Sequence, residues 1–220
     1  DWLIRERPVA LKKYGLDYRD EFNMTPLLAA LKTGAGKVPD YLLQQGAKLD
    51  VTDNFGISPF LMALQQAQVN TDFMQQRLPV LYPKLQPEAV KVKIDNHLVK
   101  ISMRSAEFFL LHHFLVSQTT VIMKKSDFED RGINMDDITS ACAKYPDVIL
   151  PEFRKKRTYI NSILSKNEKD RDDPYNKKLF VRIARGVYVL NPDLEIWVAE
   201  DQWMNVYDMM FSEKMTAERN

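Results

Sequence analysis

The segment FRKKRTYINSILSKNEKDRDDPYNKKLFVRIARGVYVLNP, residues 153–192, decides the fold of this chain. Within it, Thr158–Lys166 places apolar residues at helical spacing and predicts an amphipathic helix. The polar stretch Asn167–Asn176 has little to bury and predicts a loop. Leu179–Leu190 then alternates around Arg185-Gly186. Because glycine tolerates the positive φ of a tight reversal, this pattern predicts two short antiparallel strands.

Positive charges gather at both ends of this segment. The candidate nucleic-acid contacts are Arg154, Lys155, Lys156 and Arg157 before the helix, Tyr159, Asn161 and Ser162 on it, and Lys177, Lys178, Arg182 and Arg185 around the hairpin. Charges near a helix start and near a hairpin suit phosphates on two sides of a groove. Four acidic residues lie between the two basic groups, so the loop that carries them has to point away from phosphate. The alternative is a small α+β subdomain whose charges are only solvated.

The same residues carry a family resemblance. Arg157–Ile160, Ile163-Leu164 and the closing run Leu179–Leu190 resemble the HARE-type winged helix-turn-helix over about residues 105–192. The resemblance implies nucleic-acid recognition, with DNA favoured over RNA, and no catalytic centre. Two departures are the long insert Lys166–Lys178 and the spacer Val148–Phe153. Winged helices also bind proteins, so the fold alone does not decide the ligand.

The N-terminal part contains an internal repeat. DEFNMTPLLAAL, residues 20–31, aligns with DNFGISPFLMAL, residues 53–64, at a constant offset of 33. A fixed period of this size predicts a stacked repeat array. In both copies a hydroxyl residue, Thr25 or Ser58, precedes a proline, which predicts a capped helix with proline in its first turn.

This repeat resembles the ankyrin repeat over about residues 8–82, through Thr25–Leu27, Ala29-Ala30, Leu42-Leu43, Gly46-Ala47, Asp53 and Ser58–Phe60. Asn23 stands where Gly56 supplies the turn glycine of the next copy, and Leu28 and Leu61 replace the usual histidine. The resemblance implies binding of a protein partner. The alternative is a packing element that binds nothing. Pro8–Tyr14 is expected to be the second helix of an earlier, incomplete repeat, and Thr71–Leu81 the second helix of the last one. Two repeats are few for an independent stack. Either more repeats lie upstream, or the next domain caps the array.

Pro83–Pro87 is expected to break the helical pattern. Val90–Ile101 then alternates around Asp95-Asn96 and predicts a β-hairpin. Its lysines form a solvated face in the preferred interpretation, and contact with phosphate is the alternative. Beyond the hairpin the sequence predicts helices from Ser105 to about Ser117, over Ser126–Arg131, and over Met135–Lys144 with an Asn134 cap.

Several residue types that often carry chemistry have a simpler explanation here. His112 and His113 are neighbours on a helix and point about 100° apart, so they are poor partners for one metal ion. Asp136 and Asp137 fall in a first helical turn, where carboxylates complement the helix dipole. Cys142 lies on an apolar side and no base is evident beside it. We therefore expect no enzyme activity, no metal and no cofactor.

Bulk properties set the remaining limits. The 220 residues have a formal net charge of +1 and a single cysteine. Nucleic-acid binding then has to come from a local patch, and the single cysteine suits a reducing, intracellular compartment, cytoplasmic or nuclear. No apolar run is long enough to span a membrane. The chain opens on Asp1 without an initiator methionine, so we expect a fragment of a longer protein. Residues 193–220 include seven acidic and two basic residues, and a C-terminal helix with Trp203, Met204, Tyr207, Met210 and Phe211 is expected there.

The sequence therefore predicts a mainly α protein with small β elements, organised in three parts. These are an ankyrin-repeat-like region over residues 1–86, a β-hairpin connector over 87–104, and a winged-helix-like domain with a C-terminal helix over 105–220. The expected function is a non-enzymatic adaptor or regulator that contacts nucleic acid through the winged helix and a protein through the repeats. The alternative is a protein–protein interaction scaffold, possibly the accessory region of a larger effector or enzyme.

Overall fold

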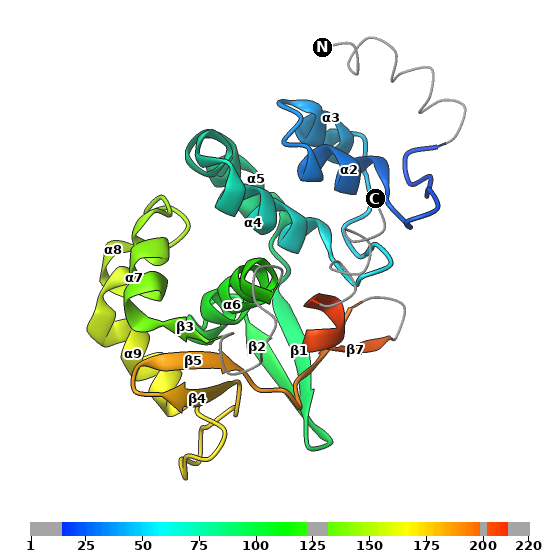
Figure 1. The fold of residues 1–220 in the computed structure, drawn as a ribbon. Helices are drawn as coiled ribbons and strands as arrows, with labels where there is room; N and C mark the ends of the chain where they lie inside the picture. Colours follow the sequence, from blue (N-terminus) through cyan, green and yellow to red (C-terminus); the bar gives the residue numbers. More distant parts are fainter. Residues whose placement is uncertain (1–14, 123–131, 199–201, 211–220) are drawn as a thin grey trace. The chain divides into compact units, whose positions relative to one another are not determined.

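The computed structural model describes residues 15–122, 132–198 and 202–210. It combines helices with small antiparallel sheets (Figure 1), so the expected mixture of helices and small β elements is confirmed. The chain divides into two compact units, residues 1–86 with 198–200, and residues 87–197 with 201–220. The helices expected over Pro8–Tyr14 and Ser126–Arg131, and Phe211, lie outside the described residues.

The first unit consists of helices joined by short turns. They are α2 (Pro26–Lys32), α3 (Val38–Gln44), α4 (Pro59–Val69), the π-helical turn η1 (Phe73–Arg77) and α5 (Leu78–Leu85). The Thr25 hydroxyl accepts a hydrogen bond from the N–H of Leu28, and the Ser58 hydroxyl accepts one from Leu61. Each side chain satisfies an N–H that the helix itself leaves unpaired. The two predicted caps are therefore confirmed.

The 33-residue period extends to the backbone of the turns before α2 and α4. Asp20 Oδ1 accepts hydrogen bonds from the N–H groups of Phe22 and Met24, and Asp53 Oδ1 accepts the equivalent pair from Phe55 and Ile57. The turns are also joined to each other. The N–H of Asn54 donates to the carbonyl of Phe22 at 3.1 Å, and its side chain donates to the carbonyl of Glu21 at 3.2 Å.

The helix that ends the first unit is longer than the sequence predicts. The helical pattern ends within Pro83–Pro87 as expected, but α5 includes Pro83 and ends at Leu85. Proline removes only one intrahelical hydrogen bond. Leu81, Tyr82 and Leu85 are all buried around it, so apolar packing holds the last turn in place.

The second unit has two sheets and a set of helices (Figure 1). Its helices are α6 (Ala106–Ile122), α7 (Met135–Ala143), α8 (Glu152–Lys155) and α9 (Arg157–Lys166). The first helix runs past the predicted end at Ser117. Asn134 caps α7 as predicted, since its side-chain oxygen accepts the N–H of Asp137 at 2.8 Å.

A four-stranded antiparallel sheet has the order β2-β1-β6-β7. The strands are β1 (Ala89–Ile94), β2 (His97–Ser102), β6 (Glu195–Trp197) and β7 (Trp203–Asn205). The predicted hairpin of β1 and β2 is confirmed, and its turn residues Asp95 and Asn96 have φ of 49° and 64°. Such paired positive values match the twist of the two strands. The hairpin thus forms one half of this sheet.

The C-terminal segment differs from its predicted helix. Trp203 and Met204 belong to β7 and face Trp197 and Ile196 of β6 across the sheet. Helix begins only after Asn205, whose side-chain oxygen accepts the N–H of Tyr207 at 2.8 Å, and it covers residues 206–210 of the described chain. Strand pairing prevails here because it gives the backbone of both short segments hydrogen-bond partners.

A three-stranded antiparallel sheet has the order β3-β5-β4, with β3 (Ile133–Asn134), β4 (Phe180–Ala184) and β5 (Val187–Leu190). The predicted reversal at Gly186 is confirmed, with φ of 70°. The sheet packs through Phe180 against Phe114 of α6, with ring centroids 5.0 Å apart. Gln118 of α6 also accepts the N–H of Leu190 at 3.0 Å, so α6 fixes the hairpin by both apolar and polar contacts.

Candidate nucleic-acid interface

Helix α9 presents a polar side to solvent while its apolar side is buried. Ile160 and Leu164 are buried, whereas Asn161 is exposed and Ser162 is half-buried. The half-buried Tyr159 ring packs edge-on against Phe153, with centroids 5.8 Å apart. Asn161 and Ser162 can therefore reach a ligand laid along the helix, whereas Tyr159 is partly committed to packing.

The four basic residues before α9 do not form a uniform cationic cluster. Lys155 has a side chain only 9% exposed, and its ammonium lies 2.5 Å from Asp147 and 3.4 Å from Glu152. The hydrogen bond to Asp147, the largest effect, raises the pKa of Lys155. Lys155 is thus held in ion pairs with two carboxylates of the same unit. The expectation that it contacts nucleic acid is thus not supported by its surroundings.

The neighbours of Lys155 differ in how available they are. Arg154 donates to the backbone carbonyl of Arg104 at 3.1 Å, which directs its guanidinium along the protein. Arg157 forms an ion pair with Asp136, and both side chains are exposed. Lys156 is exposed and has no carboxylate partner among the described residues. It is therefore the most available cation of the four.

Lys177 and Lys178 belong to a different place in the unit. The Lys177 ammonium lies 2.6 Å from Glu107 of α6. Burial acts to raise the pKa of Glu107, but the hydrogen bond and charge of Lys177 hold it below its ordinary value. Lys178 lies 3.7 Å from Asp95 at the tip of the β1–β2 hairpin. Both lysines tie the loop to neighbouring elements.

The hairpin β4–β5 carries the remaining two predicted cations. Arg182 stands opposite Tyr188 in the sheet, and Arg185 occupies the turn next to Gly186. Both side chains are exposed, and neither has a carboxylate partner among the described residues. A register irregularity between Arg182 and Ala184 twists the strand at this position. Among the described residues, these two arginines are therefore the hairpin's cations without an ion pair.

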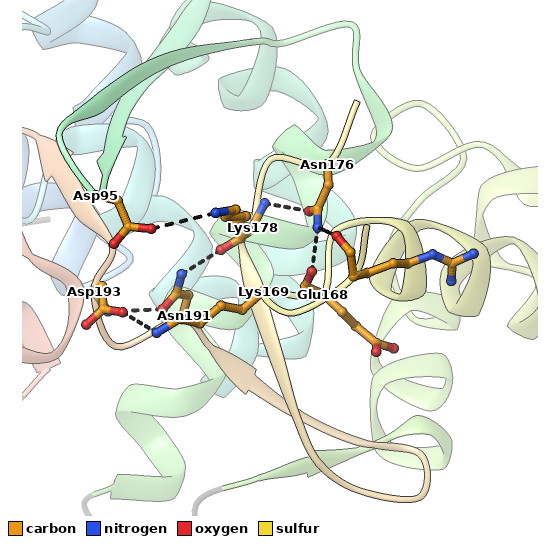
Figure 2. Close-up of polar contacts among 8 residues, drawn as sticks. Asp95, Glu168, Lys169, Asn176, Lys178, Asn191 and Asp193 are labelled. Atoms are coloured by element: carbon orange, nitrogen blue, oxygen red, sulfur yellow. Dashed lines mark hydrogen bonds and ion pairs between the residues drawn. The ribbon is translucent and has the colours of Figure 1, made fainter. Parts of the chain in front are cut away.

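The loop between α9 and β4 is held by buried and half-buried asparagines (Figure 2). The Asn176 side chain donates to the carbonyls of Glu168 and Arg171 at 2.6 and 2.8 Å, and its oxygen accepts the N–H of Lys178 at 2.7 Å. Asn191 donates to the carbonyl of Lys178 at 2.8 Å.

The stretch Asn167–Asn176 buries little, as expected, because Asn167 is its one buried residue. Asn167 is 2% exposed, and it donates to Ile163 and accepts from Lys177. Hydrogen bonds of its polar side chains, instead of apolar packing, hold the loop in its conformation. The loop is thus a specified structure, although its charged residues Asp170 and Asp172 are exposed.

One cation near α9 was not among the predicted contacts. Arg171 is exposed, and its guanidinium donates to the hydroxyl and carbonyl of Ser165 on α9. It adds a positive charge at the C-terminal half of this helix. The sequence contains no signal for it, because a loop with no regular period brings the two residues together.

His112, His113 and Cys142 sit in the core of the second unit. Burial lowers the pKa of His112 and of His113 to about 4, and it raises that of the Cys142 thiol to about 12. His112 Nδ1–H donates to the carbonyl of Phe108 at 2.7 Å, which assigns the tautomer with the proton on Nδ1. Within the described ranges, no three His, Cys, Asp or Glu side chains are grouped as metal ligands would be.

Of the eleven predicted contacts, the exposed residues without a carboxylate partner in the described chain are Lys156, Asn161, Arg182 and Arg185. No described helix combines the length and the apolar character needed to cross a bilayer. A search of protein-family models, of curated proteins and of solved structures finds no match to this chain.

Proposed function

We propose that this chain is a non-enzymatic adaptor whose second unit contacts nucleic acid as a winged helix and whose first unit binds a protein as an ankyrin-like array. The observation that carries the nucleic-acid part is that Arg182 and Arg185 are exposed and have no carboxylate partner in the part of the chain that the structure describes. Ion pairs to neighbouring carboxylates hold Lys155, Arg157, Lys177 and Lys178, and these two arginines have none in the described chain.

The order of elements supports the winged-helix part of the proposal. Helix α6, strand β3, helices α7 and α9, and the hairpin β4–β5 follow one another along the chain, and β3 pairs with β5. A winged helix uses this order to place its last helix in a groove and its hairpin on the adjacent backbone. The short α8 is an addition within the spacer that precedes α9.

The net charge and the ion pairs reduce the number of residues that we propose as nucleic-acid contacts. The whole chain has a formal net charge of +1, so attraction to phosphate has to be local. We propose that Lys156 and the arginine pair bind backbone phosphates, and that Asn161 approaches base edges or sugar. Arg157 joins them by exchanging its exposed partner Asp136 for phosphate. Exposed ion pairs are worth about 1 kcal/mol or less, so this exchange costs little.

The repeated turns support the protein-binding part. In stacked repeat arrays, the surface made by successive turns and inner helices is extended and suits a folded protein ligand. Phe22 at the first turn is 44% exposed, and Phe55 holds the same place in the second turn. We propose that this face of the repeats carries the protein contact.

A protein-interaction scaffold without nucleic acid is the second candidate, and one observation favours it. Apolar side chains are exposed beside α8, with Phe153 at 55% and Val148 at 71%. Exposed apolar groups of this kind suit a protein surface better than a phosphate backbone.

Fluorescence anisotropy with a labelled DNA duplex across a salt series separates the two candidates. The test variant is Arg182→Glu/Arg185→Glu. The matched control is Lys37→Glu/Lys48→Glu, which changes the charge equally on exposed residues of the first unit. Each phosphate contact contributes about 0.9 to the slope of log affinity against log salt, so losing two lowers that slope by about 1.8.

Duplex binding that weakens in the test variant and persists in the control supports the adaptor. Absence of duplex binding at low salt, or equal weakening in both variants, overturns its nucleic-acid part and leaves the scaffold. The same series with RNA duplex and single strands determines the preferred nucleic acid.

A further inference from the structure

The four-stranded sheet of the second unit has one buried and one open face. Alternate residues of β1, namely Val90, Val92 and Ile94, are buried, and α6 contacts the sheet (Figure 1). The other residues of β1 point to the opposite face, because successive strand side chains alternate. Packing in the core therefore does not determine which residue types occupy the open face.

Two lysines stand directly opposite each other on this open face. Lys91 of β1 pairs with Lys100 of β2 in the strand register, and both side chains are exposed. Like charges at directly opposed positions destabilise a sheet. Neither ammonium has a carboxylate partner within the described ranges. An anionic ligand that contacts both ammoniums would offset this cost.

The same face also carries two indole rings. Lys91 Nζ lies 4.4 Å from the ring centroid of Trp197, and Lys93 Nζ lies 5.2 Å from that of Trp203. The two tryptophans face each other across β6 and β7, and both are half-buried. Leu98, opposite Lys93, is 64% exposed. We call the set Lys91, Lys93, Lys100, Trp197 and Trp203 the lysine–tryptophan face.

We propose that the lysine–tryptophan face binds a stretch of single-stranded nucleic acid. Phosphates would sit on Lys91 and Lys100, and unpaired bases would stack on the indole rings after displacing the ammoniums that cover them. Charge complementarity supports an anionic ligand, since Glu195, paired with Lys93, is the one carboxylate among the residues of this face in the described strands. Proteins that bind single-stranded nucleic acid commonly use aromatic and basic side chains together on an open sheet.

A single strand fits these observations better than an acidic protein segment does. An acidic segment would satisfy the lysines and leave the indoles without a function. Each base stacked on an aromatic ring contributes about 1–3 kcal/mol, and this contribution is independent of sequence. This surface uses none of the residues proposed to contact a duplex. The inference therefore stands or falls separately from the winged-helix proposal.

The experiment uses the whole chain and a labelled 20-nucleotide oligothymidylate, with tryptophan fluorescence as a second readout. The test variant is Lys91→Gln/Lys100→Gln, which removes both charges and keeps the side-chain stems. A Lys37→Gln/Lys48→Gln variant is the charge-matched control. We expect about tenfold weaker binding in the test variant, and a salt slope lower by about 1.4, because each phosphate on a single strand contributes about 0.7.

Quenching of tryptophan fluorescence by the oligonucleotide, reduced in Trp203→Leu because Trp197 remains, would support stacking. Binding unchanged by Arg182→Glu/Arg185→Glu would place it on a surface separate from the duplex site. The inference is overturned if oligothymidylate does not bind, if Lys91→Gln/Lys100→Gln and the control bind it equally, or if polyglutamate competes with it at equal charge concentration. The last result would assign the face to acidic proteins.

Discussion

Asn23 and Gly56 occupy equivalent places in two turns whose backbones match, with φ of 62° and 74°. In each turn the residue's N–H donates to the carbonyl of the aspartate three positions earlier. A residue with a Cβ loses roughly 1–2 kcal/mol in this conformation, and glycine does not. Asn23 offsets this cost with a hydrogen bond from its side chain to the carbonyl of Thr52 at 3.2 Å.

Substituting alanine at each of these two positions is expected to lower the free energy of unfolding, for a different reason at each. Gly56→Ala incurs the strain of positive φ, about 1–2 kcal/mol. Asn23→Ala keeps the strain already present and loses the bond to Thr52, about 1 kcal/mol. Urea unfolding followed by circular dichroism measures both, with Lys48→Ala as the exposed control. A Gly56→Ala variant as stable as the wild type would contradict the assigned turn.

The buried histidines predict a loss of stability in acid. Burial lowers the pKa of His112 and His113 to about 4, so the unfolded chain takes up protons more readily than the folded one. Stability therefore falls as pH drops below about 6.5 and continues to fall to about 4, by roughly 3 kcal/mol per histidine.

The variant His113→Phe isolates one of these contributions. Phenylalanine keeps the stacking on Phe109 and cannot be protonated. Urea unfolding at pH 7 and pH 4.5 should show a smaller acid loss in the variant than in the wild type. Equal losses would mean that His113 is not the group that titrates.

Lys155 is expected to contribute to stability and not to binding. Replacing it by methionine leaves Asp147 without its partner, and the duplex affinity should stay within about twofold. The partners raise the Lys155 pKa, so their contribution is present at neutral pH and is lost as pH rises through the folded-state value. Thermal unfolding and anisotropy on the same samples check both parts. A tenfold loss of affinity in a folded variant would return Lys155 to the interface.

The elements that the sequence predicts well are those with a local signal. Thr25 and Ser58 cap their helices, Asp95-Asn96 and Gly186 make tight turns, and Asn134 starts α7, because the residue types at these places act through neighbours in the chain. The pairing of β1 with β6 joins segments about a hundred residues apart, and no local pattern specifies it. For that reason the sequence predicts helix where the short strand β7 forms.

The sequence predicts which residue types form the candidate site, but not which of their charges are left without a carboxylate partner. Four consecutive basic residues, Arg154–Arg157, are easily recognised in the sequence as a cluster of positive charge. The sequence does not show that Asp147, 8 residues before Lys155, and Asp136, 21 residues before Arg157, form ion pairs with two of its four cations. The contact between Arg171 and Ser165 depends on the path of an irregular loop, which composition leaves open.

The loop after α9 is expected to depend on Asn167. Its alanine variant removes an acceptor for the N–H of Lys177 and a donor to the carbonyl of Ile163. Each buried group left unsatisfied costs about 1–3 kcal/mol. Limited trypsin digestion should cut the variant faster at Arg171 and Lys177, while the exposed Asn161→Ala control digests as the wild type. Equal digestion of all three would show that the asparagine does not hold the loop.

Gly132 is expected to control the hairpin without touching any ligand. A Cβ at this position would lie 2.3 Å from Val187 Cγ1 and 2.6 Å from Ile183 Cδ1, so Gly132→Ala forces β3 away from the hairpin. Under the winged-helix proposal, this displacement moves Arg182 and Arg185 and weakens duplex binding several-fold. Gly132→Ala/Val187→Ala removes the closest clashing atom and should recover part of both stability and affinity. A double variant no better than the single one would show that close packing at β3 does not position the hairpin, since the rescue acts only through the space that Val187 occupies.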